Sequence, residues 1–395
     1  MRNDTLLFLQ KIECPVCKAI NEYETIKIGA YEEQGRDSDF CPTNIKWSNP
    51  KYQKFNPILF FMATCSNCYY TREYTSKFKD WKNDTTFRTY RLKTMKARHT
   101  EHLAQESSII RTLGERLHSD KYPLQTAINK LLLGIYDEML LDKPSNLDIA
   151  RYFLRIGWLF RECTSSESGG HDIHLSFVAK LEKDVKTLNE VSMRLSEVRT
   201  RLKSSIHSFL EDASFTTDAV ATELNEKCQQ AMAFLAGANE QFESAMSNFS
   251  NAIRISSDSI VCVSDNDAFA MPYAGSKSYR DFLKELRYKW EFIPVSEHEA
   301  LRLAMEFYKA AYETGYEVSA GNQQIQVEYL LGELCRRLCR NEEAKKYFNN
   351  TIRSAQEFIY QYKGDNARTA LARKILDMAM TQGKLNIKET KVAES

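Results

Sequence analysis

The spacing of hydrophobic residues changes along the chain, and this change separates a β-rich beginning from a long helical remainder. Residues 21–28 (NEYETIKI) alternate as a strand does, and residues 58–64 (ILFFMAT) form an apolar run typical of a buried strand. From Phe87 onward the pattern is that of a helix, and from about Lys121 it keeps helical spacing. We therefore predict an α+β fold that is mainly α.

Several segments of this remainder have the features of paired helices in helical repeats. Pro123 opens a helix that ends at residues 143–145 (KPS), and Asn146 can cap a second helix over 147–162. The clearest case lies near the C-terminus, where small residues would let two helices approach closely. A tetratricopeptide-like repeat is predicted there over about 323–356, from Leu331, Gly332, Ala344, Phe348 and Ile352.

A second repeat is predicted in two parts. Residues 156–160 resemble its first helix, and residues 304–311 resemble its second helix, which starts at a capping box formed by Ser296 and Glu299. The sequence between the two parts is therefore an insertion. Residues 367–380 are expected to form a terminal helix that covers the last repeat.

The insertion carries two long apolar stripes. Leucines recur every seven residues in the first, and apolar residues step by four and three in the second, as in a coiled coil. A polar break at 211–218 joins them, so we favour an antiparallel hairpin that projects as an arm over a parallel dimer. The stripes consist of Leu181, Leu188, Leu195, Leu202 and Phe209, then Leu224, Cys228, Ala231, Leu235, Ala238, Phe242, Ala245 and Phe249.

Four cysteines occur as two pairs with the same spacing, Cys14 with Cys17 and Cys65 with Cys68. Two residues between the thiols suit a tight turn that presents both sulfurs to one ion, and two such turns complete a tetrahedron. Four thiolates with no open position favour a structural Zn ion over iron. The alternative is buried free cysteines. Because the start of the chain lacks the features of a secretory signal, we expect its ten cysteines to be reduced.

These patterns predict five regions. The first is a small zinc-ribbon-like domain, and the next is a helical region that includes the first tetratricopeptide-like helix. An inserted coiled-coil hairpin with its linker, the tetratricopeptide-like helical repeats and a flexible tail follow. The predicted bounds of the five regions are 8–86, 87–163, 164–295, 296–382 and 383–395.

A loop between the two cysteine pairs holds Asp37, Asp39 and Cys41. Cys41 can be read as a substitute for one metal ligand, although the four paired thiols already satisfy the usual count. The two aspartates can be read as an acidic metal or catalytic pair, but carboxylates two residues apart in a loop more often form turns. We interpret the loop as structural.

The chain has almost no net charge, with 54 basic and 53 acidic residues, so it offers no global field to attract nucleic acid or membranes. Its apolar runs are too short to cross a bilayer, and we expect a cytoplasmic protein. One local exception is the basic segment 71–98, in which aromatic residues are interleaved. Such a segment can bind a nucleic-acid strand, but the solvated face of a helix has the same composition.

Other candidate clusters have simpler interpretations. His171, Asp172 and His174 follow two glycines and are more typical of a loop and a helix cap than of a metal or acid–base site, and nearby Cys163 does not change this. Cys335 and Cys339 lie one helical turn apart, where small thiols suit packing. The sequence contains no common catalytic motif, so we do not expect an enzyme.

The N-terminal motifs resemble a bacterial family catalogued as domain of unknown function 2225. The resemblance lies in 14–17 (CPVC), 36–42 (RDSDFCP), 56–57 (NP) and 65–69 (CSNCY). It implies helices of tetratricopeptide type after the cysteine pairs and a bacterial cytosolic protein, and brings no established activity. Members usually have glycine where Tyr69 stands. The match covers about residues 8 to 163 and resumes after about 297, so we expect the arm between to be particular to this chain or a subset.

Three functional hypotheses follow. The leading one is a zinc-binding adaptor or scaffold that binds a protein or peptide through its helical repeats, with the arm extending reach or mediating homo-oligomerisation. The second is a nucleic-acid-binding regulator that uses the ribbon and segment 71–98. The third is an enzyme whose site forms near the loop that contains Asp37, Asp39 and Cys41.

Overall fold

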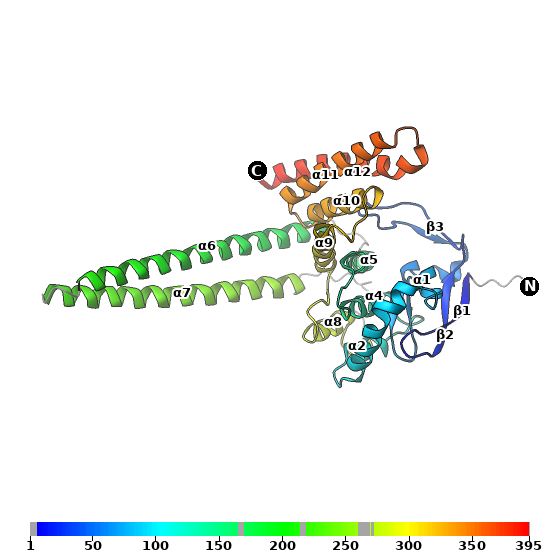
Figure 1. The fold of residues 1–395 in the computed structure, drawn as a ribbon, viewed down its shortest axis with the longest axis horizontal. Helices are drawn as coiled ribbons and strands as arrows, with labels where there is room; N and C mark the ends of the chain where they lie inside the picture. The colour runs from blue at the N-terminus through cyan, green and yellow to red at the C-terminus, as the bar shows by residue number, and fades with distance from the viewer. Residues whose placement is uncertain (1–5, 165–169, 214–218, 260–268, 270–271, 395) are drawn as a thin grey trace, which may run out of the picture. The chain divides into compact units, whose positions relative to one another are not determined.

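The structure is a computed structural model that describes residues 6–164, 170–213, 219–259, 269 and 272–394. The chain forms two compact units. One consists of Met1–Ser168 with Val263–Ser395, and the other of Gly169–Cys262. The fold is mostly helical with a few small antiparallel sheets near the N-terminus, so the predicted fold class is confirmed (Figure 1).

Three two-stranded antiparallel sheets lie in the N-terminal region of the first unit. Strand β1 (Leu7–Glu13) pairs with β2 (Ile20–Ile26), β3 (Tyr31–Glu33) with β4 (Ile45–Trp47), and β5 (Met62–Thr64) with β6 (Thr71–Glu73). Two-stranded sheets of this size are marginal alone in water. Their stability therefore depends on what they pack against.

The predicted strand over 58–64 is wrong in its first half. A 3-10 helix, η2 (Pro57–Phe60), precedes the short strand β5. The side-chain oxygen of Asn56 accepts a hydrogen bond from the N–H of Ile58 at 2.9 Å, and Pro57 has the φ of a first helical residue. This local cap outweighs the strand preference of the apolar run. A similar Asn–Pro start opens η1 (Pro50–Tyr52).

The remaining elements of the first unit are helical. Before the arm they comprise α1 (Ser76–Lys79), the π-helical turn η3 (Phe87–Arg91), α2 (Leu92–Ala104), α3 (Ile109–Gly114), α4 (Pro123–Met139) and α5 (Asn146–Thr164). After it they comprise α8 (Tyr279–Arg287), α9 (Glu297–Thr314), α10 (Asn322–Arg337), α11 (Asn341–Gln361) and α12 (Asn366–Glu394).

Glycines mark the closest helix crossings, as their spacing predicts. Helix α5 packs on α9, although the arm separates them in sequence, and a Cβ at Gly157 would lie 2.8 Å from the Leu301 side chain. Helix α10 packs on α11 in the same way, because a Cβ at Gly332 would lie 2.8 Å from the Phe348 ring. Fully buried Ala304 and Ala344 allow the same close approach.

Two parts of the chain differ from the predicted organisation. Residues 279–287, expected in a linker, form α8, and its Tyr279 is fully buried and donates a hydrogen bond to Asn129 Oδ1 at 2.8 Å. The predicted flexible tail over 383–395 is instead the end of α12, which runs to Glu394. Buried Asn386 holds it by donating to the carbonyl of Asn341 at 2.9 Å.

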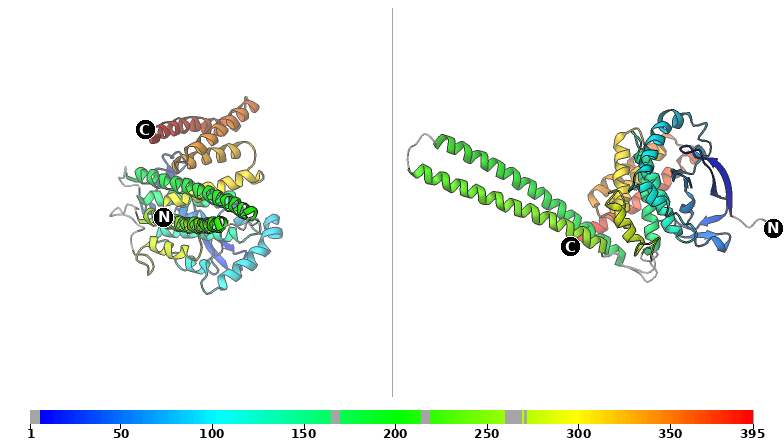
Figure 2. Two further views of the ribbon diagram at one scale, coloured as in Figure 1. Left: turned by 90° about the vertical axis from the view of Figure 1, so that its left-hand side faces the viewer. Right: turned by 90° about the horizontal axis from the view of Figure 1, so that it is seen from below.

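The second unit consists of two long helices, α6 (Gly170–Ala213) and α7 (Ala219–Ser259), which lie side by side (Figures 1 and 2). The predicted apolar stripes are only partly covered. Leu195 and Leu202 remain 48% and 43% exposed, and Phe249 remains 42% exposed. The expected seam between the two helices is therefore not a dry interface in the described residues.

The crossing of α10 and α11 predicts opposite effects for two glycine substitutions. Gly332→Ala places a methyl group against the buried Phe348 ring, and overpacking costs about 1–3 kcal/mol. The better helix propensity of alanine offsets about 1 kcal/mol of this. Gly383→Ala is the matched control, since its Cβ would meet the same Phe348 at an ordinary 3.8 Å.

In denaturant unfolding followed by circular dichroism, Gly332→Ala should lower the free energy of unfolding, and Gly383→Ala should leave it unchanged or raise it. Equal stabilities of the two variants would contradict the close crossing.

Candidate metal centre and its surroundings

The four paired cysteines lie in two turns of the same construction. In the first, the N–H of Cys14 donates to the carbonyl of Ala19 at 2.8 Å, and the N–H of Lys18 donates to the carbonyl of Cys14 at 3.0 Å. In the second, Cys65 and Tyr69 make the equivalent bonds, both at 2.9 Å. The first turn joins β1 to β2 and the second joins β5 to β6. Each hairpin therefore presents two thiols at its tip.

The two turns bring all four sulfurs together. The Sγ atoms of Cys14 and Cys68 lie 3.7 Å apart, those of Cys17 and Cys65 lie 3.5 Å apart, and all four lie within 4.8 Å of one another. A tetrahedron with metal–sulfur bonds of about 2.3 Å has edges of about 3.8 Å. The sulfurs are too far apart for disulfides, which need about 2.05 Å. The geometry is therefore that of a site able to hold one metal ion.

The cluster is largely shielded from water. Cys14 and Cys65 are fully buried, and Cys68 is nearly so, among apolar side chains that include Ile12, Val16 and Tyr23. The hydrogen bond between the sulfurs of Cys14 and Cys65 raises the pKa of Cys14 to about 12 and lowers the pKa of Cys65. A metal ion binds cysteine as the thiolate, so its binding to this cluster would release protons from the thiols.

Asn21 in β2 supports the second turn, and sequence analysis did not identify it. Its side-chain N–H donates to the sulfur of Cys65 at 3.3 Å, and its oxygen accepts from both the N–H and the hydroxyl of Ser66, at 2.8 and 2.7 Å. This buried amide links the β1–β2 hairpin to the β5–β6 hairpin. Such hydrogen bonds to ligand residues orient a metal site. An asparagine inside a strand was the only sequence signal.

A buried pair, His99 and Asp137, supports the second turn from the other side. His99 Nε2 donates to the carbonyl of Cys68 at 2.8 Å, and its Nδ1 lies 2.6 Å from Asp137 Oδ1. Asp137 Oδ2 accepts from the N–H of Thr71 at 2.8 Å. Burial lowers the pKa of His99, but the charge of Asp137 outweighs it and raises the pKa. The pair anchors the turn to α2 and α4, a contact between distant segments that periodicity does not reveal.

The residue after each turn has a left-handed backbone. The φ angles of Lys18 and Tyr69 are 67° and 63°, a conformation that favours glycine. Tyr69 stands at the position where members of the family that the N-terminal motifs resemble usually have glycine. Its ring lies on Gly114, where a Cβ would meet the ring at 2.1 Å. The space left by Gly114 therefore lets a tyrosine occupy this strained position.

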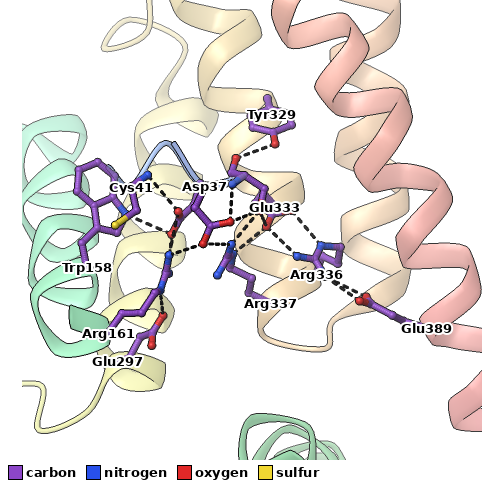
Figure 3. Close-up of polar contacts among 12 residues, drawn as sticks. Asp37, Cys41, Trp158, Arg161, Glu297, Tyr329, Glu333, Arg336, Arg337 and Glu389 are labelled. Carbon is purple, nitrogen blue, oxygen red and sulfur yellow. Dashed lines mark hydrogen bonds and ion pairs between the residues drawn. The ribbon is translucent and has the colours of Figure 1, made fainter. Parts of the chain in front are cut away.

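The Asp37–Cys41 loop lies outside the thiol cluster and is held by Arg161 of α5 (Figure 3). The guanidinium of Arg161 bonds Asp37 at 2.9 Å, Asp39 at 2.7 Å and Glu297 of α9 at 2.7 Å. Trp158 Nε1 also donates to Asp39 at 3.1 Å. Both loop carboxylates are thus bound to helical residues.

Helix α10 holds the same loop from a second side (Figure 3). Arg337 pairs with Asp37 at 2.9 Å, and the hydroxyl of Tyr329 donates to the carbonyl of Ser38 at 2.7 Å. The hydroxyl of Ser38 donates to Glu333 at 2.6 Å, and Glu333 is fully buried between Arg336 and Arg337. The loop therefore joins α5 to α10 through ion pairs that are largely removed from water.

The ionisation of this loop does not suit acid–base or nucleophilic chemistry. Burial raises the pKa of Asp39, but the hydrogen bond and charge of Arg161 and the charge of Arg337 outweigh it, so the pKa is lowered. Burial raises the pKa of the Cys41 thiol to about 12. The aspartates therefore stay ionised and bound, and Cys41 stays a thiol outside the four-cysteine cluster.

Segment 71–98 is less available than its composition indicates. Lys82 pairs with Glu13 at 2.7 Å, and Arg91 and Arg98 pair with Glu138 and Asp142. Of the five interleaved aromatic residues, only Tyr90 is well exposed; Phe78, Trp81 and Phe87 are buried, and Tyr74 is partly buried.

The other candidate residues are not brought together. Cys335 is buried in α10, where burial raises its pKa to about 12, and Cys339 is exposed. The side chains of Cys163, His171, Asp172 and His174 lie outside the described residues. In the described part of the chain, the four-cysteine cluster is a group of side chains close enough together to hold a metal ion.

Comparison with known proteins identifies one family. The model of DUF2225, described as an uncharacterized protein conserved in bacteria, matches residues 7–263 and 281–374. The chain belongs to the DUF2225 family. The match covers the arm, so the expectation that it would break off at about residue 163 and resume only after about 297 was wrong. No curated protein and no solved structure shows significant similarity. Among the described residues, no helix is long and apolar enough to span a membrane.

The support from α2 predicts a large effect of removing the buried histidine. His99→Ala leaves the carboxylate of Asp137 buried without its partner, and breaking a buried pair costs about 3–5 kcal/mol. His118→Ala, at an exposed histidine, is the control and should change stability by less than about 0.5 kcal/mol. Urea unfolding of the two variants measures the difference. A His99→Ala variant as stable as the control would show that the pair does not anchor the turn.

Proposed function

We propose that the cysteine cluster of this DUF2225 protein binds one zinc ion and that the ion is structural. The sulfur geometry supports this, because the distances of 3.5 and 3.7 Å are close to the edge of a zinc–sulfur tetrahedron. Soft thiolates favour zinc or iron over magnesium, calcium or manganese. Four protein ligands fill a tetrahedral zinc and leave no position for substrate. On this proposal the N-terminal sheets form a zinc ribbon.

The proposed ion explains how small sheets remain folded. The turns that carry Cys14 and Cys65 belong to different hairpins, and the ion would cross-link their tips. Because such sites do not exist in an unfolded chain, the free energy of binding contributes to folding.

Metal analysis tests the zinc proposal with a matched pair of serine variants. Cys65→Ser removes a ligand and should lose most of the zinc, whereas Cys41→Ser changes a partly buried thiol outside the cluster and should keep one ion per chain. If Cys65→Ser does not fold, titration of the wild type with a mercurial reagent under denaturant-free conditions replaces it, and zinc should be released as the cluster thiols react. Purified wild type without zinc, or equal zinc in both variants, would overturn the proposal.

We further propose that the protein acts as an adaptor that binds other proteins through its helices. The main support for this proposal is that α5 and α10 bind the Asp37–Cys41 loop, a non-helical peptide segment, through Arg161, Arg337 and Tyr329. Helices that pack as α5 on α9 and α10 on α11 resemble tetratricopeptide hairpins, whose exposed faces commonly bind peptides. The exposed leucines of the arm favour homo-oligomerisation as well.

The two alternatives have less support. Nucleic-acid binding through segment 71–98 is less favoured, because Lys82, Arg91 and Arg98 already form intramolecular ion pairs. Three of the aromatic rings in this segment are also buried in the core and cannot stack on bases. An enzyme site at the Asp37–Cys41 loop would need free titratable groups, and both carboxylates there are bound by arginines. We therefore do not propose catalysis.

Capture of partners in the native bacterium tests the adaptor proposal. Cells that express the tagged chain are cross-linked before lysis, and the linked peptides are identified. We expect the same partner protein in independent replicates, with cross-links on α5, α9–α12 or the arm. Failure to recover any reproducible partner, or recovery only of nucleic acid, would contradict an adaptor.

A further inference from the structure

A large cleft lies in the first unit between the N-terminal region and the helices. Its volume is about 710 Å³, within the range of ligand-binding sites. One wall comes from β3, β4 and η2, and the other from α5, α10 and α12. The cleft is separate from the cysteine cluster, none of whose four residues lines it.

The helical wall is built from one face of each contributing helix. Helix α5 contributes Leu147, Arg151, Leu154, Arg155 and Trp158, whose spacing places them on one helical face. Helix α10 contributes Gln323, Gln326, Val327 and Leu330, also on one face, and α12 contributes Leu371 and Lys374. Among the described residues, α11 contributes none and α9 contributes Tyr308. The cleft is thus a groove along alternate helices of the helical array.

Arg155 is the distinctive residue of this groove. Its guanidinium lies 4.1 Å from the centre of the Phe61 ring and 5.7 Å from that of Trp158. Its Nη1 donates to the carbonyl of Arg151 at 2.9 Å, and no carboxylate of the described residues lies within ion-pair distance. Burial and the charge of Arg151 lower the pKa of Arg155. A guanidinium has five N–H donors, and the hydrogen bond to the carbonyl of Arg151 uses one of them.

The charge of the groove is positive. Lys374 also has no carboxylate partner in the described part of the chain, whereas Arg151 pairs with Asp148 and Glu73, and Arg36 pairs with Glu33. Among the residues that the structure describes, Glu33 is the single carboxylate that lines the cleft. Two cations are therefore uncompensated, and a ligand with carboxylates would restore the balance.

The chain itself shows how these helices bind such a ligand. The Asp37–Cys41 segment lies next to the cleft, since Arg36, Phe40 and Pro42 line it. Its carboxylates bind Arg161 of α5 and Arg337 of α10, and its carbonyl at Ser38 accepts from Tyr329. Arg161 lies six residues after Arg155 on the same helix. An acidic peptide segment is thus already bound at one end of the groove.

We propose that the open part of the groove binds an extended acidic peptide segment of a partner protein, with carboxylates on Arg155 and Lys374 and apolar side chains against Phe61, Trp158 and Leu330. The proposal rests on the adaptor function and names the partner's chemistry and its site. The aromatic neighbours fix the guanidinium in place, so little conformational entropy is lost on binding. Gln326 adds an amide for the peptide backbone.

Fluorescence anisotropy with a set of labelled peptides of eight to ten residues tests the proposal. The peptides combine glutamate or aspartate with aromatic and aliphatic residues, and each has a matched version in which lysine replaces every acid. We expect the purified full chain to bind some acidic peptides and none of the lysine versions. Binding should weaken as salt rises, because exposed charges are screened.

Substitutions inside and outside the groove test where the peptide binds. Arg155→Gln removes the guanidinium but keeps an unbranched polar side chain, and it should weaken peptide binding at least tenfold. Lys374→Glu should weaken it severalfold. Arg353→Gln, an exposed arginine on α11 outside the groove, should have no effect. If Arg155→Gln proves unfolded by circular dichroism, exposed Lys374 decides the question, since its substitution removes no buried contact.

Three results would overturn the groove proposal: no acidic peptide binds, lysine versions bind equally well, or the groove variants bind as the wild type does. The adaptor function can then still be judged separately. If cross-linking in cells recovers the same partner with the wild type and with Arg155→Gln, the adaptor proposal stands and its surface lies elsewhere. Loss of the partner with Arg155→Gln, but not with Arg353→Gln, supports both.

Discussion

The convergence of four cysteine sulfurs within 4.8 Å is the constraint on which the N-terminal region depends. The sheets around them have only two strands each and cannot bury a sufficient core alone. Asn21 and the His99–Asp137 pair hold the second cysteine turn against β2, α2 and α4. Our proposal that zinc occupies the cluster adds a cross-link between the hairpin tips, so that metal, buried amide and buried ion pair together fix the position of the region.

A second set of polar contacts, made by the Asp37–Cys41 loop, connects the N-terminal region to the helices. The Asp37–Cys41 loop lies between β3 and β4, and its carboxylates bind Arg161 and Arg337. Buried ion pairs add little stability over apolar packing, but breaking one side is costly, so they favour a single arrangement. The loop thereby defines one end of the groove that contains Arg155. The Asp37–Cys41 loop thus connects the cysteine-containing N-terminal region to the groove proposed to bind a peptide.

Sequence patterns correctly predicted the features that depend on residues close together along the chain. Helical periodicity located the C-terminal pairs, and Gly157 and Gly332 do mark close crossings. Equal cysteine spacing identified the four clustered thiols. Predictions failed where a local cap or a distant contact decided the outcome: Asn56 and Pro57 start a 3-10 helix in an apolar run, and buried Asn386 keeps the last residues helical. His99, Asp137 and Arg155 gave no signal, because their roles arise only when segments far apart meet.

We propose that one zinc ion is bound by the sulfurs of both cysteine pairs. X-ray absorption at the zinc edge of the purified chain measures this directly, since it reports the number, type and distance of the bound atoms. We predict four sulfur neighbours at about 2.3 Å and no nitrogen or oxygen neighbour. Nitrogen or oxygen atoms in the coordination sphere, fewer sulfurs, or the absence of zinc from the folded protein would contradict the account.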